Sequence, residues 1–277
     1  MRIPVCEPEI GKEEIKNVLL CLKDKQISGT GGTYVSEFED KFSNYCNAKY
    51  GIATSSGTTA IHLALAAIGI KKGDEVIVSN LTNIATVYGV VYSGATPVLV
   101  DCERKTWNID PAQIQDKITK RTRAIMVVHL YGHPVDMTPV LNIARKHGLY
   151  LIEDAAESHG AEYRGKRVGC LGDIGCFSFY ANKIITTGEG GMVVTKNRDI
   201  YERAQLLKNL AFSRKRRFFH YHIGFNYRMT NIQAAMGLAQ LERIGEILKK
   251  KIYNAQVYNS LLDGTDGIVL PPSEPWA

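Results

Sequence analysis

A lysine followed by a Thr- and Gly-rich turn is the feature of this sequence best suited to chemistry. The segment SFYANKIITTGEGG (178–191) places Lys183 just after a run that predicts a buried strand. Glycines let the backbone approach a ligand closely, and the hydroxyls can hydrogen-bond phosphate. An amine in a partly dry pocket loses its proton more readily, which suits Lys183 to Schiff-base chemistry. The spacing fits a surface lysine beside a turn equally well.

A second candidate is the carboxylate of Asp154, which ends the hydrophobic run at the start of the segment LIEDAAESHG (151–160). Asp154 falls at the carboxyl edge of the predicted strand, where open α/β sheets bind ligands. There it can pair with a protonated pyridine nitrogen and keep a cofactor ring an effective electron sink. The same pattern fits a helix N-cap, which the sequence alone slightly favours.

The third candidate is a turn between a predicted strand and a predicted helix, Ser55-Ser56-Gly57-Thr58-Thr59. It brings backbone N–H groups, hydroxyls and a helix N-terminus to one place, which is the composition of a phosphate site. Many capped helices look similar, so this motif is weak by itself.

The elements that must position these residues alternate along the chain. Apolar runs rich in Val and Ile, several of them unbroken, predict strands buried on both faces. Amphipathic patterns between them, such as Ile61/Leu65/Ile68, Ile200/Ala204/Leu207 and Ile232/Met236/Ala239, predict helices. The alternation predicts an α/β fold with a mainly parallel, seven-stranded sheet between helices. The predicted strands are Tyr50–Thr54, Glu75–Ser79, Pro97–Asp101, Ala124–Leu130, Tyr150–Asp154, Gly175–Tyr180 and Gly191–Thr195.

The two ends of the chain differ from this central pattern. Residues 1–50, with a helix expected near Glu13–Lys23, predict an N-terminal segment that contributes to a small domain or a dimer. Residues 51–243 predict the large α/β domain, and 244–277 the start of an incomplete C-terminal small domain. In that last stretch a charged helix, Ile244–Leu262, precedes Gly267–Leu270, which predicts the beginning of a strand.

Composition excludes several classes of protein. The 277 residues are 45% hydrophobic and 22% charged, which is ordinary for a soluble globular protein. No run is long enough to cross a bilayer, and the first residues include acids and lack an apolar signal region, so we expect a cytoplasmic protein without a membrane role. Six scattered cysteines predict reduced, packed thiols. The net charge of +6 is partly concentrated in Arg214–Arg217, but nothing repeats this run along a face, which argues against nucleic-acid binding.

Together these segments resemble the sugar aminotransferases of the DegT type, within the fold-type-I pyridoxal-phosphate enzymes. The resemblance covers nearly the whole chain, and the lysine segment with its trailing Gly-Glu-Gly-Gly is its most specific part. Within the family the chain is most similar to perosamine synthases. The other matching segments are Ile3-Pro4-Val5, Ser56-Gly57-Thr58, GDEVIV (73–78), HLYGH (129–133), EDAAE (153–157) and NYRMTN (226–231).

The resemblance implies a role for each matching residue, with pyridoxal 5'-phosphate as the cofactor. Lys183 is the catalytic residue, which carries the cofactor and then moves the proton at the sugar carbon. The implied cofactor-binding residues are Gly57, Thr58 and Ser178 at the phosphate, Asp154 at the pyridine nitrogen, Glu157 near the phenolic oxygen, and Asn226 from a neighbouring subunit. The implied substrate-binding residues are Arg216, His220 and Arg228, although a solvated basic loop remains an equal alternative for any single arginine in Arg216–His220. His62, Phe179 and Tyr180 are expected to pack in the core, and no histidine spacing indicates a metal site.

The implied reaction moves an amino group from glutamate to C4 of a nucleotide-linked 4-keto-6-deoxy sugar, as in perosamine synthesis for O-antigen polysaccharide. Dehydratase relatives have His where this chain has Lys183, so the lysine favours transamination. The implied active unit is a homodimer with shared active sites. The alternative is a truncated, non-catalytic binding or regulatory relative that keeps the large domain and the dimer surface.

Two departures from the family pattern favour that alternative. The family usually has an aromatic residue that stacks on the cofactor ring after Leu81-Thr82, and this chain has Asn83. Loss of that stacking face is expected to weaken cofactor binding by about 1 kcal/mol. The second departure is length, because relatives continue beyond the point at which this sequence stops.

Overall fold

A seven-stranded sheet forms the centre of the computed structural model, which describes residues 4, 6–213, 216 and 218–277. The strand order is β1-β9-β8-β5-β4-β2-β3, and the pairs β2–β3, β2–β4, β4–β5 and β5–β8 are parallel. Only β9 runs antiparallel to its neighbours β1 and β8. The mainly parallel seven-stranded sheet predicted from the apolar runs is therefore confirmed. The strands of this sheet are β1 (Tyr50–Thr54), β2 (Glu75–Ser79), β3 (Thr96–Val100), β4 (Thr122–Val128), β5 (Tyr150–Asp154), β8 (Ile174–Ser178) and β9 (Gly191–Thr195).

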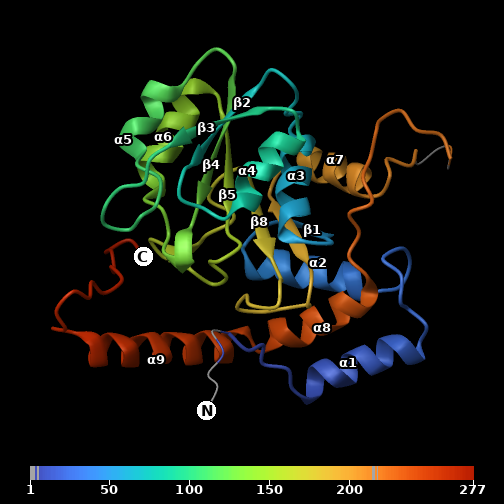
Figure 1. Cartoon of the computed structure of the whole chain (residues 1–277). Coiled ribbons are helices and arrows are strands. Elements are labelled where there is room, and N and C mark those ends of the chain that lie inside the picture. The colour runs from blue at the N-terminus through green and yellow to red at the C-terminus, as the bar shows by residue number, and fades with distance from the viewer. Residues whose placement is uncertain (1–3, 5, 214–215, 217) are drawn as a thin grey trace.

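Helices cover both faces of the sheet and divide the core into two (Figure 1). On one face α3 and α7 pack on β1, β8 and β9 around Ile61, Leu65 and Leu207. On the other face α2 and α8 pack around Phe38 and Phe42. Burial of both faces explains why the central strands are continuously apolar. The helices are α1 (Lys12–Lys23), α2 (Tyr34–Tyr45), α3 (Gly57–Ala67), α4 (Ile84–Tyr92), α5 (Pro111–Ile114), α6 (Met137–His147), α7 (Arg198–Lys208), α8 (Asn231–Glu242) and α9 (Ile244–Leu262).

Short elements complete the chain. The 3-10 turns η1 (Gln115–Lys117) and η2 (Leu130–Gly132) follow α5 and β4, and a small hairpin joins β6 (Glu162–Tyr163) to β7 (Lys166–Arg167). Among the residues that the structure describes, no helix has the length and apolarity of a membrane span.

The N-terminal segment packs on a helix that lies far away in the sequence. In Figure 1, α1 runs beside α8, and Asn17 Nδ2 donates to the carbonyl of Ala235. Glu14, fully buried, accepts hydrogen bonds from Gln240 Nε2 (2.8 Å) and from the backbone of Gly11 (2.7 Å). The division into 1–50, 51–243 and 244–277 stays a prediction. Of the resembling opening motif, Ile3 and Val5 lie outside the described residues.

The strand predicted at Gly267–Leu270 is wrong. This stretch is irregular, and Val269 is 92% exposed. A strand needs a neighbour for its backbone hydrogen bonds, and none lies beside this one in the described part of the chain. The chain then returns to the body, where Trp276 packs on the core and its carbonyl accepts from the Arg164 N–H (2.7 Å).

Candidate active site

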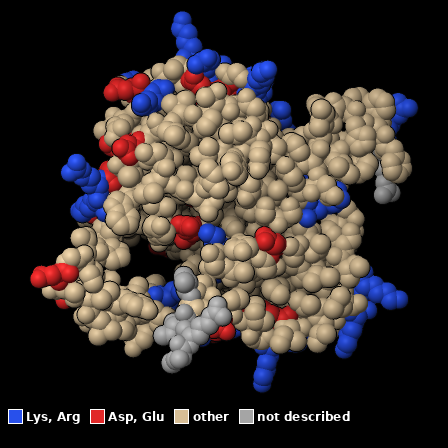
Figure 2. All heavy atoms as spheres, in the orientation of Figure 1, with Lys and Arg blue, Asp and Glu red and all other residues tan. Residues whose placement is uncertain are grey.

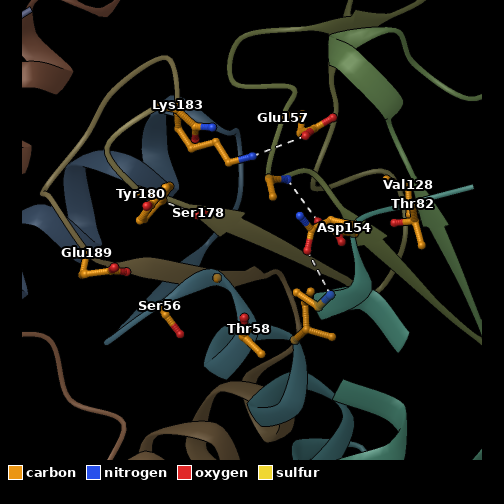
Figure 3. Close-up of a pocket in the computed structure, with 16 residues that line it drawn as sticks. Ser56, Thr58, Thr82, Val128, Asp154, Glu157, Ser178, Tyr180, Lys183 and Glu189 are labelled. Atoms are coloured by element: carbon orange, nitrogen blue, oxygen red, sulfur yellow. Dashed lines mark hydrogen bonds and ion pairs between the residues drawn. The ribbon is translucent and has the colours of Figure 1, made fainter. Parts of the chain in front are cut away.

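The predicted chemical residues meet at a cavity of about 250 Å³ at the carboxyl edge of the sheet (Figure 3). Its walls come from the end of β5, the first turn of α3, the segment before α4 and the loop after β8. Parallel strands end at a common edge, so residues far apart in sequence are brought together there. The cavity is lined by Ser56, Gly57, Thr58, Ile61, Thr82, Asn83, Ala85, Val128, Asp154, Ala156, Glu157, Ser178, Tyr180, Asn182, Lys183 and Glu189.

Lys183 extends into this cavity and not into bulk solvent. Its side chain is only 16% exposed, and Nζ lies 3.4 Å from Oε1 of Glu157. The other oxygen of Glu157 accepts from the backbone N–H of Tyr131 (3.0 Å). Figure 3 shows Lys183 and Glu157 facing each other above Asp154. The alternative of a surface lysine beside a turn is therefore wrong.

Asp154 is held as a buried hydrogen-bond acceptor at the end of β5, with 4% exposure. Its Oδ2 accepts from the hydroxyl of Thr86 (2.7 Å), and its Oδ1 accepts from the backbone N–H of Ala156 (3.2 Å). Burial raises the pKa of this carboxyl, while those two hydrogen bonds and the charge of Lys183 oppose the rise. No helix begins after Asp154, so the helix N-cap alternative is wrong as well.

The turn before α3 has the form of an oxyanion cradle. Ser56 is the N-cap, accepting from the N–H of Thr59, and Gly57 begins the helix. A Cβ on Gly57 would lie 2.7 Å from the Cβ of Ser178, so only glycine allows this close approach. Ser178 Oγ accepts from the N–H of Tyr180 (3.3 Å), which leaves its hydroxyl proton available to the cavity.

These residues fit pyridoxal phosphate. The first turn of α3 supplies N–H groups and hydroxyls for a phosphate, the glycine leaves room for it, and Ser178 adds a donor. Asp154 presents a buried carboxylate for a protonated ring nitrogen, and Lys183 presents an amine to the same space. The chemistry of this donor set matches the phosphate, the ring nitrogen and the aldehyde of the cofactor.

The predicted residues Asn226, Arg216, His220 and Arg228 do not line this cavity. All four belong to the described part of the segment 209–228, which leaves residues 214, 215 and 217 aside and extends away from the body in Figure 1. His220 Nδ1 lies 2.8 Å from the carbonyl of Leu210, and the Arg216 guanidinium lies 5.3 Å from the ring of Phe219. Arg228 donates to Asn209 Oδ1 (2.6 Å), and Asn226 is exposed. Arg214, Lys215 and Arg217 lie outside the described residues.

Basic side chains do not gather into one patch on the face that Figure 2 shows. Among the described residues there, Lys and Arg are scattered, many of them at the outline and a few within it. The cavity itself is lined by the carboxyl groups of Asp154, Glu157 and Glu189 and by the amine of Lys183.

Three features of the site were missed or wrongly predicted from the sequence. Tyr180 was expected in the core, but it is 49% exposed and lines the cavity. Alternation through the end of β8 and the two residues after it carries the signal, because Phe177 and Phe179 belong to the core, whereas Ser178 and Tyr180 line the cavity. Glu189 lies within the predicted lysine segment 178–191, but it was not singled out as a residue of the site. Thr86 had no signal, since only the fold brings it to Asp154. The core predictions for Phe179 and His62 are confirmed, and His62 Nδ1 lies 2.9 Å from the hydroxyl of Tyr227.

Known proteins resemble this chain in sequence and in fold. The pattern of the DegT/DnrJ/EryC1/StrS aminotransferase family matches residues 8–277. GDP-perosamine synthase of Caulobacter vibrioides is 53% identical over 247 residues, which are 89% of this chain and 66% of that protein. GDP-perosamine synthase of Escherichia coli O157:H7 is 48% identical over 92% of this chain and 70% of that protein. A solved structure, the PLP form of a putative sugar aminotransferase from Streptococcus pneumoniae, has a TM-score of 0.90 and 28% identity, covering 95% of this chain and 72% of that one. The chain therefore spans about two thirds of these relatives' length.

Proposed function

This chain belongs to the DegT/DnrJ/EryC1/StrS aminotransferase family, and from that premise we propose that it transfers an amino group from glutamate to C4 of a nucleotide-linked 4-keto-6-deoxy sugar. The substrate is proposed from the GDP-perosamine synthases that the chain resembles. Pyridoxal phosphate is the cofactor that the family and the PLP form of the Streptococcus pneumoniae structure indicate. The observation that carries the proposal is Lys183 Nζ inside the cavity that Asp154 also lines.

The residues of the chain divide the work of this reaction. Asp154 would hold the ring nitrogen of the cofactor, while Gly57, Thr58 and Ser178 would hold its phosphate. Bound pyridoxal phosphate supplies an aldehyde carbon to carry the amino group and a ring that accepts the electron pair of a broken C–H bond. Lys183 takes a proton from the amino donor and delivers one to C4 of the sugar. The carboxylate of Glu157 lies 3.4 Å from Nζ and orients the amine toward the cavity.

The charges of the cavity support a second subunit at the site. A nucleotide sugar and glutamate are anions, yet three of the four ionisable groups named above in the described lining are carboxyls. Cations from elsewhere must therefore neutralise the substrate. We propose that the segment 209–228 of a second copy supplies Arg216, His220 and Asn226, and that Arg228 supports the base of that segment.

The surface beside the cavity supports the same homodimer. Ile84, Tyr88 and Tyr92 follow one face of α4 at intervals of one helical turn and are 56%, 45% and 57% exposed. A stripe of this kind, next to an acidic cavity, suits burial against another copy. We place the reaction in the cytoplasm, because the six cysteines are unpaired, as is usual in a reducing compartment.

The proposed activity is tested by incubating the protein with pyridoxal phosphate, glutamate and a panel of GDP-, UDP- and dTDP-linked 4-keto-6-deoxy sugars. We expect mass spectrometry to show a GDP-linked sugar in which the keto oxygen is replaced by an amino group, with an equal amount of 2-oxoglutarate. Lys183→Ala should give neither product. A wild-type protein that binds the cofactor yet leaves every sugar and the glutamate unchanged would support the non-catalytic alternative.

A further inference from the structure

A pair of threonines connects the wall of the cavity to the buried carboxylate. Thr86 is fully buried in the first turn of α4, and its hydroxyl donates to Asp154 Oδ2 over 2.7 Å. Thr82 Oγ1 lies 2.7 Å from Thr86 Oγ1, and Thr82 lines the cavity. The segment before α4 thereby contacts the end of β5 through two hydroxyl groups.

The direction of both hydrogen bonds follows from proton counting. A threonine hydroxyl has one proton, and that of Thr86 is donated to the carboxylate, which has none to give. Thr82 must therefore donate to Thr86. The result is a chain of fixed polarity, Thr82 to Thr86 to Asp154, in which each bond strengthens the next.

The start of α4 holds this chain in place. Asn83 caps the helix, because its Oδ1 accepts from the N–H of Ala85 (3.0 Å), and its carbonyl accepts from the N–H of Thr86 (3.1 Å). An aromatic residue at position 83 has no acceptor with which to make this side-chain cap. Capping fixes where α4 begins, and so fixes Thr86 in the first turn beside Asp154. The partial positive charge of the helix N-terminus also favours a carboxylate there.

We propose that Thr82 and Thr86 are positioning residues that orient Asp154 and keep it ionised for the ring nitrogen of pyridoxal phosphate. This inference rests on the proposed function, because it requires that Asp154 holds the cofactor. The only other hydrogen bond that the structure gives this carboxylate, within its described residues, comes from Ala156 at 3.2 Å. Without Thr86, Oδ2 loses its donor, and the carboxyl is free to rotate or take up a proton. A protonated carboxyl cannot form an ion pair with a protonated ring nitrogen.

The dissociation constant of pyridoxal phosphate, measured by equilibrium dialysis, tests the hydrogen-bond chain from Thr82 through Thr86 to Asp154, called the relay below, independently of turnover. Thr86→Val removes the hydroxyl at nearly constant volume and should raise this constant roughly ten- to a hundredfold, the range for a hydrogen bond to a charged group. Thr86→Ser restores the hydroxyl and should bind within roughly threefold of wild type. Thr82→Val should shift the constant in the same direction by a smaller factor. Thr195→Val is the matched control. Thr195 is a buried threonine at the end of β9, its hydroxyl donates to the carbonyl of Asp173, and it does not line the cavity.

A double-mutant cycle separates positioning from structural damage. In an Asp154→Asn background the same Thr86→Val change should alter the dissociation constant less than roughly twofold, because the carboxylate through which Thr86 acts is gone. A full-sized loss in that background, or unaltered binding by Thr86→Val alone, would overturn the relay. If Asp154→Asn weakens binding and Thr86→Val does not, only the relay is wrong. A wild-type protein that binds no cofactor would overturn the relay and the proposed function together.

Discussion

Individual side chains at this site are held by few partners, and each partner has a definite chemical effect. Lys183 is oriented by Glu157, and Asp154 accepts from one hydroxyl and one backbone N–H. The Gly57 position is fixed by Ser178, which leaves no space for a side chain. Small changes at these residues should therefore act on cofactor binding before they act on folding.

His159 offers a test of burial at the level of one residue. It is 2% exposed among Phe42, Phe177 and Phe179, and within the described part of the chain its ring makes only a weak contact with the backbone of Ser178, which opposes the lowering of its pKa. Burial, together with the positive charge of Lys183, lowers its pKa to about 3. The pKa of this histidine is lower in the folded state than its ordinary value of about 6.5. Below that value the unfolded chain binds a proton that the folded chain does not, so the folded state loses stability as the pH falls.

The free energy of unfolding should accordingly decrease faster on acidification in wild type than in His159→Phe. Each pH unit below about 6.5 costs the wild type about 1.4 kcal/mol, so the difference from the variant should grow by about 2 kcal/mol on going to about pH 5. Urea unfolding of the cofactor-free proteins at several pH values measures this difference. His147→Phe, at an exposed position in α6, is the control. Parallel pH curves for wild type and His159→Phe would contradict the assignment.

At the level of elements, the sequence predicted the type and bounds of single strands and helices better than the pairing and packing between them. Strands β1, β2, β5 and β9 have the predicted bounds, because short, mostly apolar segments between turns and helical patterns identify buried strands. Helix α2 was not singled out, although Phe38 and Phe42 lie one turn apart and both face the core. The apolar stretch Gly267–Leu270 failed as a strand because pairing depends on a neighbour, which a local pattern does not specify.

In the candidate site, too, local features could be predicted from the sequence, whereas contacts between distant residues could not. Local patterns of strand and turn singled out Lys183, Asp154 and Gly57 as candidates but left alternatives open, and Ser178 was implied only by the resemblance to the family. The contact between Thr86 and Asp154 joins residues 68 positions apart, and no local spacing indicates it. Asn83 looked like a simple loss of an aromatic ring, whereas the structure gives it a capping role in α4.

The whole molecule is proposed to act as a dimer in which side chains of each copy complete the cavity of the other. Lys183→Ala removes the amine of the cavity, while Arg216→Ala with Asn226→Ala removes the groups offered to the partner. A mixed dimer of the two variants then contains one site with both defects and one intact site. Random reassembly of equal amounts should restore about one quarter of wild-type amino transfer.

Subunit mixing, followed by the mass-spectrometric assay, measures this recovery. The separate parents, assayed at the same total concentration, are the control. Mixtures no more active than the parents would contradict a shared site, because a site built within one chain is defective in every subunit of the mixture.

The most direct test of the account is to find which residue bonds to the cofactor. Wild-type protein is incubated with pyridoxal phosphate, reduced with borohydride to fix any Schiff base, digested and analysed by peptide mass spectrometry. The account predicts that the phosphopyridoxyl group is on the peptide containing Lys183 and is absent from that peptide in Lys183→Ala. A label on another lysine, or no label on a wild-type protein that binds the cofactor, would contradict it.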